Sequence, residues 1–356
     1  MSSFNAASTE APPSAGQATV RVFELHAPGA VRVGARVVPA AGALLRLETT
    51  GVCGTDHHIF AGRIAVPTPL LLGHEVIGRL ERLTPGHGLV LEDGVAEGDR
   101  VLVAPGVPCG DCDGCARAGR CLDRPCYGLT MGGEGLTGGF SPLMSLLPGS
   151  RIYAVPEETP AARAAFAEPM ACVLSALRKA FDADYVPPGR GGLVLGFGAL
   201  GVCAAVALHA SGGPVTVLEF DPVRRALAEE LGFATLADAE EATGSFALVV
   251  DAAGTPAAFA SALELLAWSG TLVELGNFAD LGTVAIKPSD ICLRDLRVIG
   301  SGETLYEDFA PAIRLVASTP VALQNAVTEV HDFAALADPS ALFANRPVGK
   351  ALVAFA

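Results

Sequence analysis

The sequence predicts an α/β protein of two domains, in which a β-rich domain precedes a domain built on a parallel sheet. Three observations support this prediction. The chain has 356 residues, enough for two hydrophobic cores. Between residue 19 and about residue 147, short apolar runs are interrupted by Gly, Pro and Asp, as in strands joined by turns. From residue 169 onwards, short apolar strands alternate with helical patterns, which favours βαβ units.

The first domain is expected to span residues 19–168 and 301–356. Residues 43–47 and 99–103 have the pattern of strands, and residues 349–355 form a further strand that is expected to return to this domain. Residues 1–18 are rich in Ser, Ala and Pro and have neither a basic start nor an apolar run. They predict a disordered tail and no secretory signal.

The second domain is expected to span residues 169–300. Four short apolar strands are predicted, at residues 193–195, 215–218, 247–250 and 271–274. Between the second and third of them, the apolar residues of segment 222–231 have helical spacing, and Gly232 ends this helix. A parallel sheet with crossover helices follows from this alternation.

The composition argues against several kinds of partner. The formal net charge is −14, and the chain has only three lysines, so a nucleic-acid partner is not expected. The longest apolar run, residues 193–208, contains glycines and is shorter than the roughly 20 residues that cross a membrane. We expect a cytoplasmic protein with a small-molecule substrate and no membrane partner.

A glycine motif predicts a dinucleotide site. Gly196, Gly198 and Gly201 follow a predicted strand and open a helix that runs to about residue 210. The first glycine permits a tight turn, the second lets a pyrophosphate approach the backbone, and the third allows close helix packing. These glycines and Leu200 are the candidate cofactor contacts.

An acid at the end of the next strand favours NAD over NADP. Glu219 is placed to accept hydrogen bonds from the ribose hydroxyls of NAD, and its charge would repel the 2'-phosphate of NADP. Arg224 and Arg225 leave NADP as the alternative, although a solvated helix face is their simpler explanation. Asp221, directly before Pro222, is interpreted as a helix cap.

A cluster of cysteines predicts a closed zinc site. Cys109, Cys112, Cys115 and Cys121 lie close together in a glycine-rich segment of a chain with nine cysteines. Four thiolates on a tightly turning loop provide the soft tetrahedral ligand set that structural zinc prefers. Cys126 is a competing candidate for the fourth ligand. Such a site stabilises a loop and performs no chemistry.

A catalytic zinc site needs an open position, so its ligands are expected from distant segments. The candidate ligands are Cys53 in GVCGTDHH, His74 and Glu75 in GHEVIG, and Glu168 in EPM.

Taken together, GVCGTDHH, GHEVIG, the cysteine loop, EPM and GFGALG resemble the zinc-containing medium-chain dehydrogenase/reductase superfamily in order and spacing. The resemblance covers about residues 20–356. It implies a GroES-like catalytic domain and a Rossmann domain with the active site between them. The gap between Cys115 and Cys121 is shorter than the usual spacing in the family.

The resemblance also implies roles for individual residues. Cys53 and His74 match catalytic zinc ligands, Glu75 matches an acid that binds the zinc or lies behind it, and Glu168 stands where sorbitol and threonine dehydrogenases have glutamate. Whether Glu75 or Glu168 binds zinc directly is left open. Thr55 matches the hydroxyl that contacts the substrate alcohol, and His58 matches the histidine that passes its proton to solvent. Asp56 resembles an acid that orients a zinc ligand. Lys350 resembles a basic residue near the cofactor phosphate.

The implied function is hydride transfer between NAD and an alcohol or polyol, which gives a ketone from a secondary alcohol or an aldehyde from a primary one. The resemblance further suggests a homodimer or homotetramer. A zinc-free reductase or a non-catalytic NAD-binding protein on the same fold is the alternative. Neither alternative needs Cys53, Thr55, His58 and His74 together. The substrate itself is left open between polyols, amino alcohols, hydroxy acids and simple alcohols.

Overall fold

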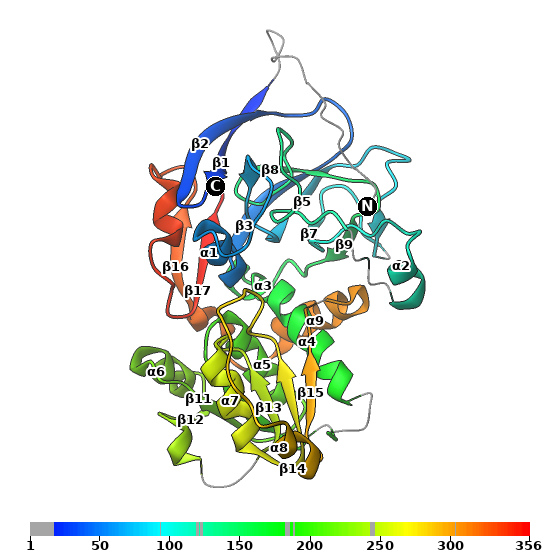
Figure 1. The fold of residues 1–356 in the computed structure, drawn as a ribbon. Helices are drawn as coiled ribbons and strands as arrows, with labels where there is room; N and C mark the ends of the chain where they lie inside the picture. The colour runs from blue at the N-terminus through cyan, green and yellow to red at the C-terminus, as the bar shows by residue number, and fades with distance from the viewer. Residues whose placement is uncertain are drawn as a thin grey trace.

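The computed structural model describes residues 18–92, 94–118, 121, 124–181, 186–187, 189–242, 246–302 and 304–356. These residues form two halves, shown one above the other in Figure 1. The expected disordered tail lies outside the described residues except for residue 18. No helix of the described residues is long and apolar enough to cross a membrane.

The first half is β-rich, and it is the GroES-like domain that the sequence predicts. It contains an eight-stranded sheet, in the order β16-β17-β3-β5-β7-β9-β6 with β8 paired to β3, and a three-stranded sheet in the order β2-β1-β4. The elements of this half are β1 (Thr19–Ala27), β2 (Ala30–Val37), β3 (Ala43–Val52), α1 (Gly54–Phe60), β4 (Leu70–Leu71), β5 (Glu75–Arg82), β6 (Val90–Leu91), β7 (Arg100–Val103), α2 (Asp113–Ala118), β8 (Leu143–Leu146), β9 (Arg151–Ala154), α3 (Ala161–Ala164), η3 (Leu323–Ala326), β16 (Val327–Asp332), η4 (Pro339–Phe343) and β17 (Lys350–Ala354).

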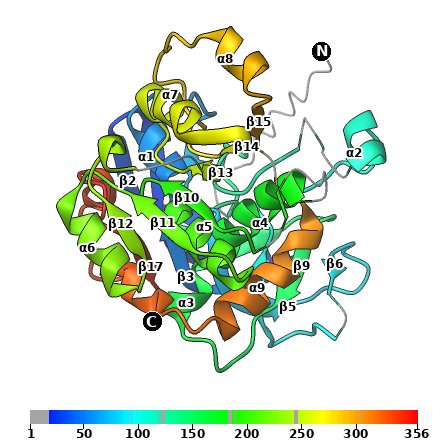
Figure 2. The same ribbon diagram turned by 90° about the horizontal axis from the view of Figure 1, so that it is seen from below.

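The second half is a Rossmann domain with six parallel strands in the order β12-β11-β10-β13-β14-β15. Its elements are α4 (Ala167–Phe181), β10 (Gly192–Leu195), α5 (Ala199–Ala210), β11 (Val215–Leu218), α6 (Pro222–Glu230), β12 (Ala234–Leu236), η1 (Ala239–Glu241), β13 (Phe246–Asp251), α7 (Pro256–Leu265), β14 (Leu266–Glu274), α8 (Pro288–Leu293), β15 (Arg297–Gly300), η2 (Tyr306–Asp308) and α9 (Phe309–Ser318). Figure 2 shows α5, α4 and α9 on one side of the strands and α7 on the other. The four strands and the helix that the sequence predicts in this half are all present.

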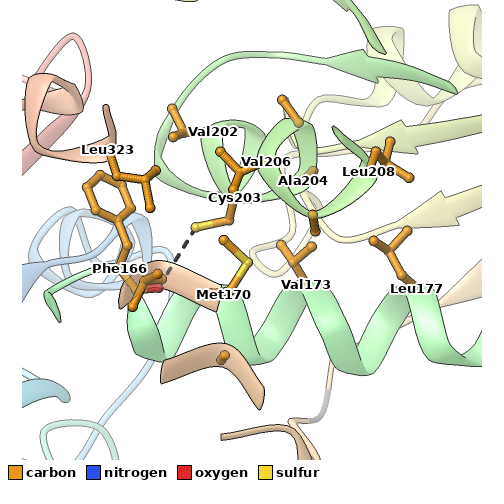
Figure 3. Packing of buried hydrophobic residues seen from close by; sticks show 14 of the residues in the cluster. Phe166, Met170, Val173, Leu177, Val202, Cys203, Ala204, Val206, Leu208 and Leu323 are labelled. Atoms are coloured by element: carbon orange, nitrogen blue, oxygen red, sulfur yellow. Dashed lines mark hydrogen bonds between the residues drawn. The ribbon is translucent and has the colours of Figure 1, made fainter. Parts of the chain in front are cut away.

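The packing of α4 on α5 follows from the apolar pattern of the two helices. Phe166, Met170, Val173 and Leu177 recur at helical spacing, and all of them are buried. Figure 3 shows them facing the side chains of α5, with the Cys203 Sγ 4.0 Å from the Phe166 carbonyl oxygen. This packing anchors the end of α4 that carries Glu168.

The chain returns to the first half later than the boundary expected at residue 301. Helix α9 packs against α4, and its apolar residues belong to the same core as the Rossmann sheet. The two halves rejoin at β16 and β17, the red strands of Figure 1. Strand β17 pairs antiparallel with β3, with Ala351 opposite Val52. Strand β17 therefore lies beside Cys53, in the eight-stranded sheet of the first half.

Candidate active site and metal centres

A cleft of about 560 Å³ is lined by residues of both halves. This volume is typical of a cofactor or small-molecule site. Ten of the predicted site residues line it: Cys53, Thr55, His58, His74, Glu75, Glu168, Gly196, Gly198, Leu200 and Glu219. The structure therefore brings the candidate zinc ligands and the glycine motif to one cavity, as the sequence predicts.

Three candidate ligands of the catalytic metal converge in this cleft. Ligand atoms of Cys53, His74 and Glu75 all lie within 4.8 Å of one another. Cys53 follows directly after β3, and Glu75 opens β5. These two strands pair antiparallel with Gly51 opposite Glu75, so the sheet register places the ligands together. A thiol, an imidazole and a carboxylate in a half-open cleft form a donor set that fits zinc.

Asp56 lies behind these ligands. Its Oδ2 accepts a hydrogen bond from the Cys53 backbone N–H at 2.8 Å, and its Oδ1 lies 3.6 Å from the His74 Nδ1. Both Oδ1 and Nδ1 are buried without a hydrogen-bond partner among the described residues. Burial lowers the pKa of His74, but Asp56 and Cys53 outweigh it and raise this pKa above its usual value. Asp56 is therefore placed to orient His74, as the sequence suggests.

Glu168 lies at the border of this ligand set. It is not among the three converging residues, and its Oε1 accepts a hydrogen bond from the Cys172 Sγ at 3.5 Å. Burial raises the pKa of Glu168 to about 7. Cys172, one helical turn later in α4, also contacts the Thr304 hydroxyl at 3.0 Å and lines the cleft. No sequence motif singled out Cys172.

The cysteine loop has the geometry of a closed zinc site. Ligand atoms of Cys109, Cys112, Cys115 and Cys121 lie within 4.8 Å of one another. The Cys109 Sγ is 3.8 Å from the Cys115 Sγ and 3.5 Å from the Cys121 Sγ. A zinc tetrahedron with Zn–S bonds of about 2.3 Å has S–S edges of roughly 3.8 Å. The donors therefore fit the ion.

The structure decides between the two candidates for the fourth ligand of this loop. Cys121 groups with the other three thiols, whereas Cys126 lines the cleft. The Cys115 backbone N–H donates to the Cys112 Sγ at 3.4 Å, and this hydrogen bond, together with the neighbouring thiols of the cluster, lowers the pKa of Cys112 to about 7. The thiolate form that binds metal is thus favoured at Cys112.

The glycine motif forms the expected turn between β10 and α5. Gly196 has a φ of +82°, a conformation that favours glycine. A Cβ atom on Gly201 would lie 2.0 Å from the Gly196 carbonyl oxygen, so only glycine allows this approach of helix to strand. Gly198 caps α5 without a side chain, which leaves the backbone N–H groups of the helix end open to a phosphate.

Glu219 anchors this turn. Its two carboxylate oxygens accept hydrogen bonds from the Phe197 N–H at 2.7 Å and the Asp221 N–H at 2.9 Å. Each oxygen keeps a further lone pair for a ligand in the cleft. Asp221 caps α6 by accepting from the backbone N–H groups of Val223 and Arg224, which confirms its interpretation as a helix cap.

Comparisons with known proteins agree with this geometry. Residues 39–157 match the family described as alcohol dehydrogenase GroES-like domain, and residues 199–318 match the family described as zinc-binding dehydrogenase. The L-galactonate-5-dehydrogenase of Escherichia coli (strain K12) is 31% identical over 337 residues, which cover 90% of this chain and 94% of that protein. The chain belongs to the zinc-dependent medium-chain alcohol dehydrogenase family.

Two further relatives support membership of this family. The D-altritol 5-dehydrogenase of Agrobacterium fabrum is 29% identical over 270 residues, which cover 74% of this chain and 77% of that protein. The crystal structure of an alcohol dehydrogenase from Thermotoga maritima shares the fold, with a TM-score of 0.84 and 23% identity over 95% of this chain and all of that one.

Lys350 differs from the role expected from the family resemblance. It is 1% exposed and does not line the cleft. Its Nζ donates a hydrogen bond to the Glu75 Oε2 and lies 5.7 Å from the Phe166 ring centroid. Burial lowers the pKa of Lys350, but Glu75 and Cys53 outweigh burial and raise it. Lys350 therefore neutralises the acid of the metal site and does not face a cofactor phosphate, because β17 carries it into the sheet.

Three other residues also differ from the sequence interpretation. His57, which the sequence analysis interprets as an exposed neighbour of His58, is only 6% exposed and packs edge-on against Phe343. Arg224 is not on a solvated helix face, because it lines the cleft and donates to the Pro347 carbonyl oxygen at 3.0 Å. Arg225 is only partly exposed, because its side chain folds back and donates to the Glu219 carbonyl oxygen at 2.9 Å.

Arg346 is a cleft residue that the sequence analysis missed. Its Nη2 lies 2.9 Å from the His58 Nε2, and it lines the same cleft as the glycine motif. Burial, Arg346 and Arg63 together lower the pKa of His58 to about 4. The only sequence signal was a basic residue shortly before Lys350, which no motif distinguishes.

Proposed function

We propose that the protein is a zinc-dependent, NAD-linked dehydrogenase of alcohols or polyols. It would oxidise a secondary alcohol to a ketone or a primary alcohol to an aldehyde, or catalyse the reverse reaction. The observation that carries this proposal is the convergence of Cys53, His74 and Glu75 in the cleft that also holds Gly196 and Glu219. A metal-ligand set beside a dinucleotide motif is the arrangement that metal-assisted hydride transfer needs.

Each residue of the site has its own role in the proposed reaction. When bound, zinc supplies Lewis-acid stabilisation of negative charge on the alcohol oxygen, and the nicotinamide accepts the hydride. Thr55, whose Oγ1 lies 3.8 Å from the Cys53 Sγ, is placed to accept the proton of the alcohol. His58, at the other end of the same helix, is placed to exchange that proton with solvent. Asp56 orients His74, and Lys350 balances the charge of Glu75.

NAD is proposed as the cofactor because of the charge of Glu219. Its side chain lines the cleft at the end of β11 and is held in place by two backbone N–H groups. A 2'-phosphate at this position would meet a fixed carboxylate, whereas ribose hydroxyls donate hydrogen bonds to it. Arg224 lies in the same cleft, so NADP is the alternative cofactor.

Polyhydroxylated substrates are favoured within the alcohol class. The two relatives described above act on L-galactonate and D-altritol according to their names. In this chain, the residues that line the cleft include Thr304, Ser301 and Glu168, which have polar side chains. Such groups satisfy the several hydroxyls of a polyol or sugar acid when water is displaced. We further propose a cytoplasmic homodimer or homotetramer.

The zinc-free alternative is disfavoured by the same geometry. A reductase without zinc, or a protein that only binds NAD, has no use for a thiol, an imidazole and a carboxylate within 4.8 Å of one another. Both alternatives predict that replacing one of these candidate metal-binding side chains leaves the catalytic activity or the NAD binding of the protein unchanged.

The test compares wild-type protein with His74→Ala. We expect the variant to lose one zinc per chain and at least about 100-fold in zinc-dependent NADH formation on a panel of polyols, sugar acids and simple alcohols. NADH binding, measured by fluorescence, should be retained because the glycine motif is intact. His26→Ala, which changes an exposed histidine of β1, is the matched control. Full activity in His74→Ala would refute the zinc site, and absence of turnover in the wild type would refute the substrate class.

A further inference from the structure

The His58 ring is held in one protonation state by Arg346. A guanidinium group has only donors, so in the 2.9 Å contact Arg346 donates and the His58 Nε2 accepts. The Nε2 therefore carries no proton, and the neutral ring has its proton on Nδ1. That Nδ1 is buried without a hydrogen-bond partner among the described residues. Only Nε2 has a lone pair for a proton from the cleft, and the guanidinium occupies it.

The surroundings of His58 supply no group that would offset this effect. The groups that act on the ring among the described residues are Arg346, Arg63 and His57, and none of them is an acid. With burial, they hold the pKa of His58 at about 4. In this state His58 takes up almost no proton near neutral pH. A histidine that relays the proton of the substrate must be able to take up a proton near neutral pH.

The cleft itself indicates what releases Arg346. This side chain lines the same cavity as Gly198, at the open N-terminus of the 12-residue helix α5. Arg224 reaches across from α6 to the Pro347 carbonyl oxygen, so two guanidinium groups meet at this point of the cleft. No carboxylate pairs with Arg346 in the part of the chain that the structure describes. A guanidinium and a helix N-terminus both attract an anion with several oxygens, such as a diphosphate.

Resting on the proposed function, we propose that Arg346 is a positioning residue that couples cofactor binding to the proton relay. Without cofactor, it donates to the His58 Nε2 and prevents the ring from accepting a proton. The diphosphate of the dinucleotide then draws the guanidinium away and frees Nε2. The proton relay is thus complete only when the cofactor is bound.

The experiment follows the imidazole of His58 by NMR in zinc-loaded protein with isotope-labelled histidine. Its signal is assigned by its absence in His58→Asn. In wild-type protein without cofactor, we expect the neutral tautomer with the proton on Nδ1 and a midpoint at least about one pH unit below the usual 6.5. NADH should raise the midpoint by about one pH unit or more, a tenfold gain in proton affinity.

Arg346→Gln is the decisive variant. Without cofactor, its His58 should titrate at a higher pH than in the wild type, but still below the usual value because the ring stays buried. NADH should raise the midpoint less than in the wild type. Arg346→Lys should restore part of the NADH response, because it keeps a charged donor. Arg63→Gln is the matched control, since Arg63 acts on the ring only through its charge. Unchanged zinc content and melting temperature would show that each variant is folded.

Equal NADH responses in the wild type and Arg346→Gln would overturn the proposal, as would a proton on Nε2 in the cofactor-free wild type. Either result combined with zinc-dependent turnover would leave the proposed function intact. An NADH response that depends on Arg346, in a protein without turnover on any alcohol, would instead support the coupling and refute the proposed reaction.

Discussion

At the scale of single residues, the site combines groups that a motif identifies with groups that only the fold brings together. Cys53, Thr55 and His58 lie within one short segment, and so do the glycines of the cofactor motif. The family resemblance of these short segments implies their roles. By contrast, Arg346 and His58 are 288 residues apart, and Lys350 and Glu75 are 275 apart. No local pattern encodes such pairs, which is why Arg346 was missed and Lys350 was misplaced.

The carboxylate of Glu219 makes a first prediction at this scale. Glu219→Ala should lower the preference for NAD over NADP by about tenfold, roughly 1.4 kcal/mol, because the charge that repels the 2'-phosphate is lost. The ratio of kcat/KM for the two cofactors measures this change. Asp221→Asn is the control, since asparagine caps a helix equally well and Asp221 does not line the cleft. An unchanged ratio in Glu219→Ala would assign cofactor choice to another residue.

A second prediction concerns Asp251, which ends β13 opposite Glu274 of β14. Its side chain is fully buried, and its Oδ1 accepts from the backbone N–H groups of Ala253 and Gly254. Burial and the nearby Glu274 raise the pKa of Asp251 to about 7. The unfolded value is about 3.9, so between these values the folded protein holds a proton that the unfolded chain has released. Stability is therefore lost as the pH rises towards 7.

Asp251→Asn should remove this pH dependence, because the amide keeps Oδ1 and has no charge. The melting temperature of the wild type should fall relative to the variant by several degrees between about pH 5 and pH 8, at about 2–4 °C for each kcal/mol. Groups that do not interact with Asp251 titrate equally in both proteins, so the difference isolates Asp251 and its interaction with Glu274. A difference that stays constant over this range would mean that Asp251 is ionised throughout.

At the scale of elements, the cysteine loop can be tested because the chain offers a matched pair of cysteines. Cys121→Ser should release one zinc per chain and lower the melting temperature by several degrees, because a closed zinc site contributes folding energy. Cys126→Ser should leave zinc content unchanged, since Cys126 lines the cleft. Zinc analysis and thermal unfolding measure both effects. The opposite ranking would place Cys126 in the ligand set.

The same scale shows where sequence patterns succeed and where they stop. The alternation of strands and helices in the second half was predictable because each strand is a continuous apolar run between turns. The residue at which the chain leaves that half, beyond residue 301, was not predictable. Helix α9 has an apolar face like any other, and nothing in its sequence states that it packs on α4. That choice depends on the three-dimensional arrangement of both halves.

At the scale of the whole molecule, exposed apolar side chains gather around the last strands of the Rossmann sheet. Trp268 is 72% exposed, Leu293 69% and Val298 42%, and β15 is the edge of its sheet. Apolar groups on an open sheet edge favour association. Light scattering should give a mass of two or four chains of 36.2 kDa each.

Trp268→Glu should lower that mass, whereas Val330→Glu should not. Val330 is 63% exposed and also lies on an edge strand, β16, but in the other half of the molecule. A monomeric wild type would refute the proposed oligomer. A mass that changes only with Val330→Glu would move the interface to the first half.

The pairing of β17 with β3 affects how the protein folds during its synthesis. Strand β17 follows all other strands of both halves along the chain, and β3, which leads into Cys53, pairs with it along four residues. During synthesis the Rossmann half can fold while one edge of β3 still lacks its neighbour. Synthesis must therefore reach β17 before the sheet of the catalytic half is complete, so a chain without β17 would leave β3 unpaired on the side that leads into Cys53.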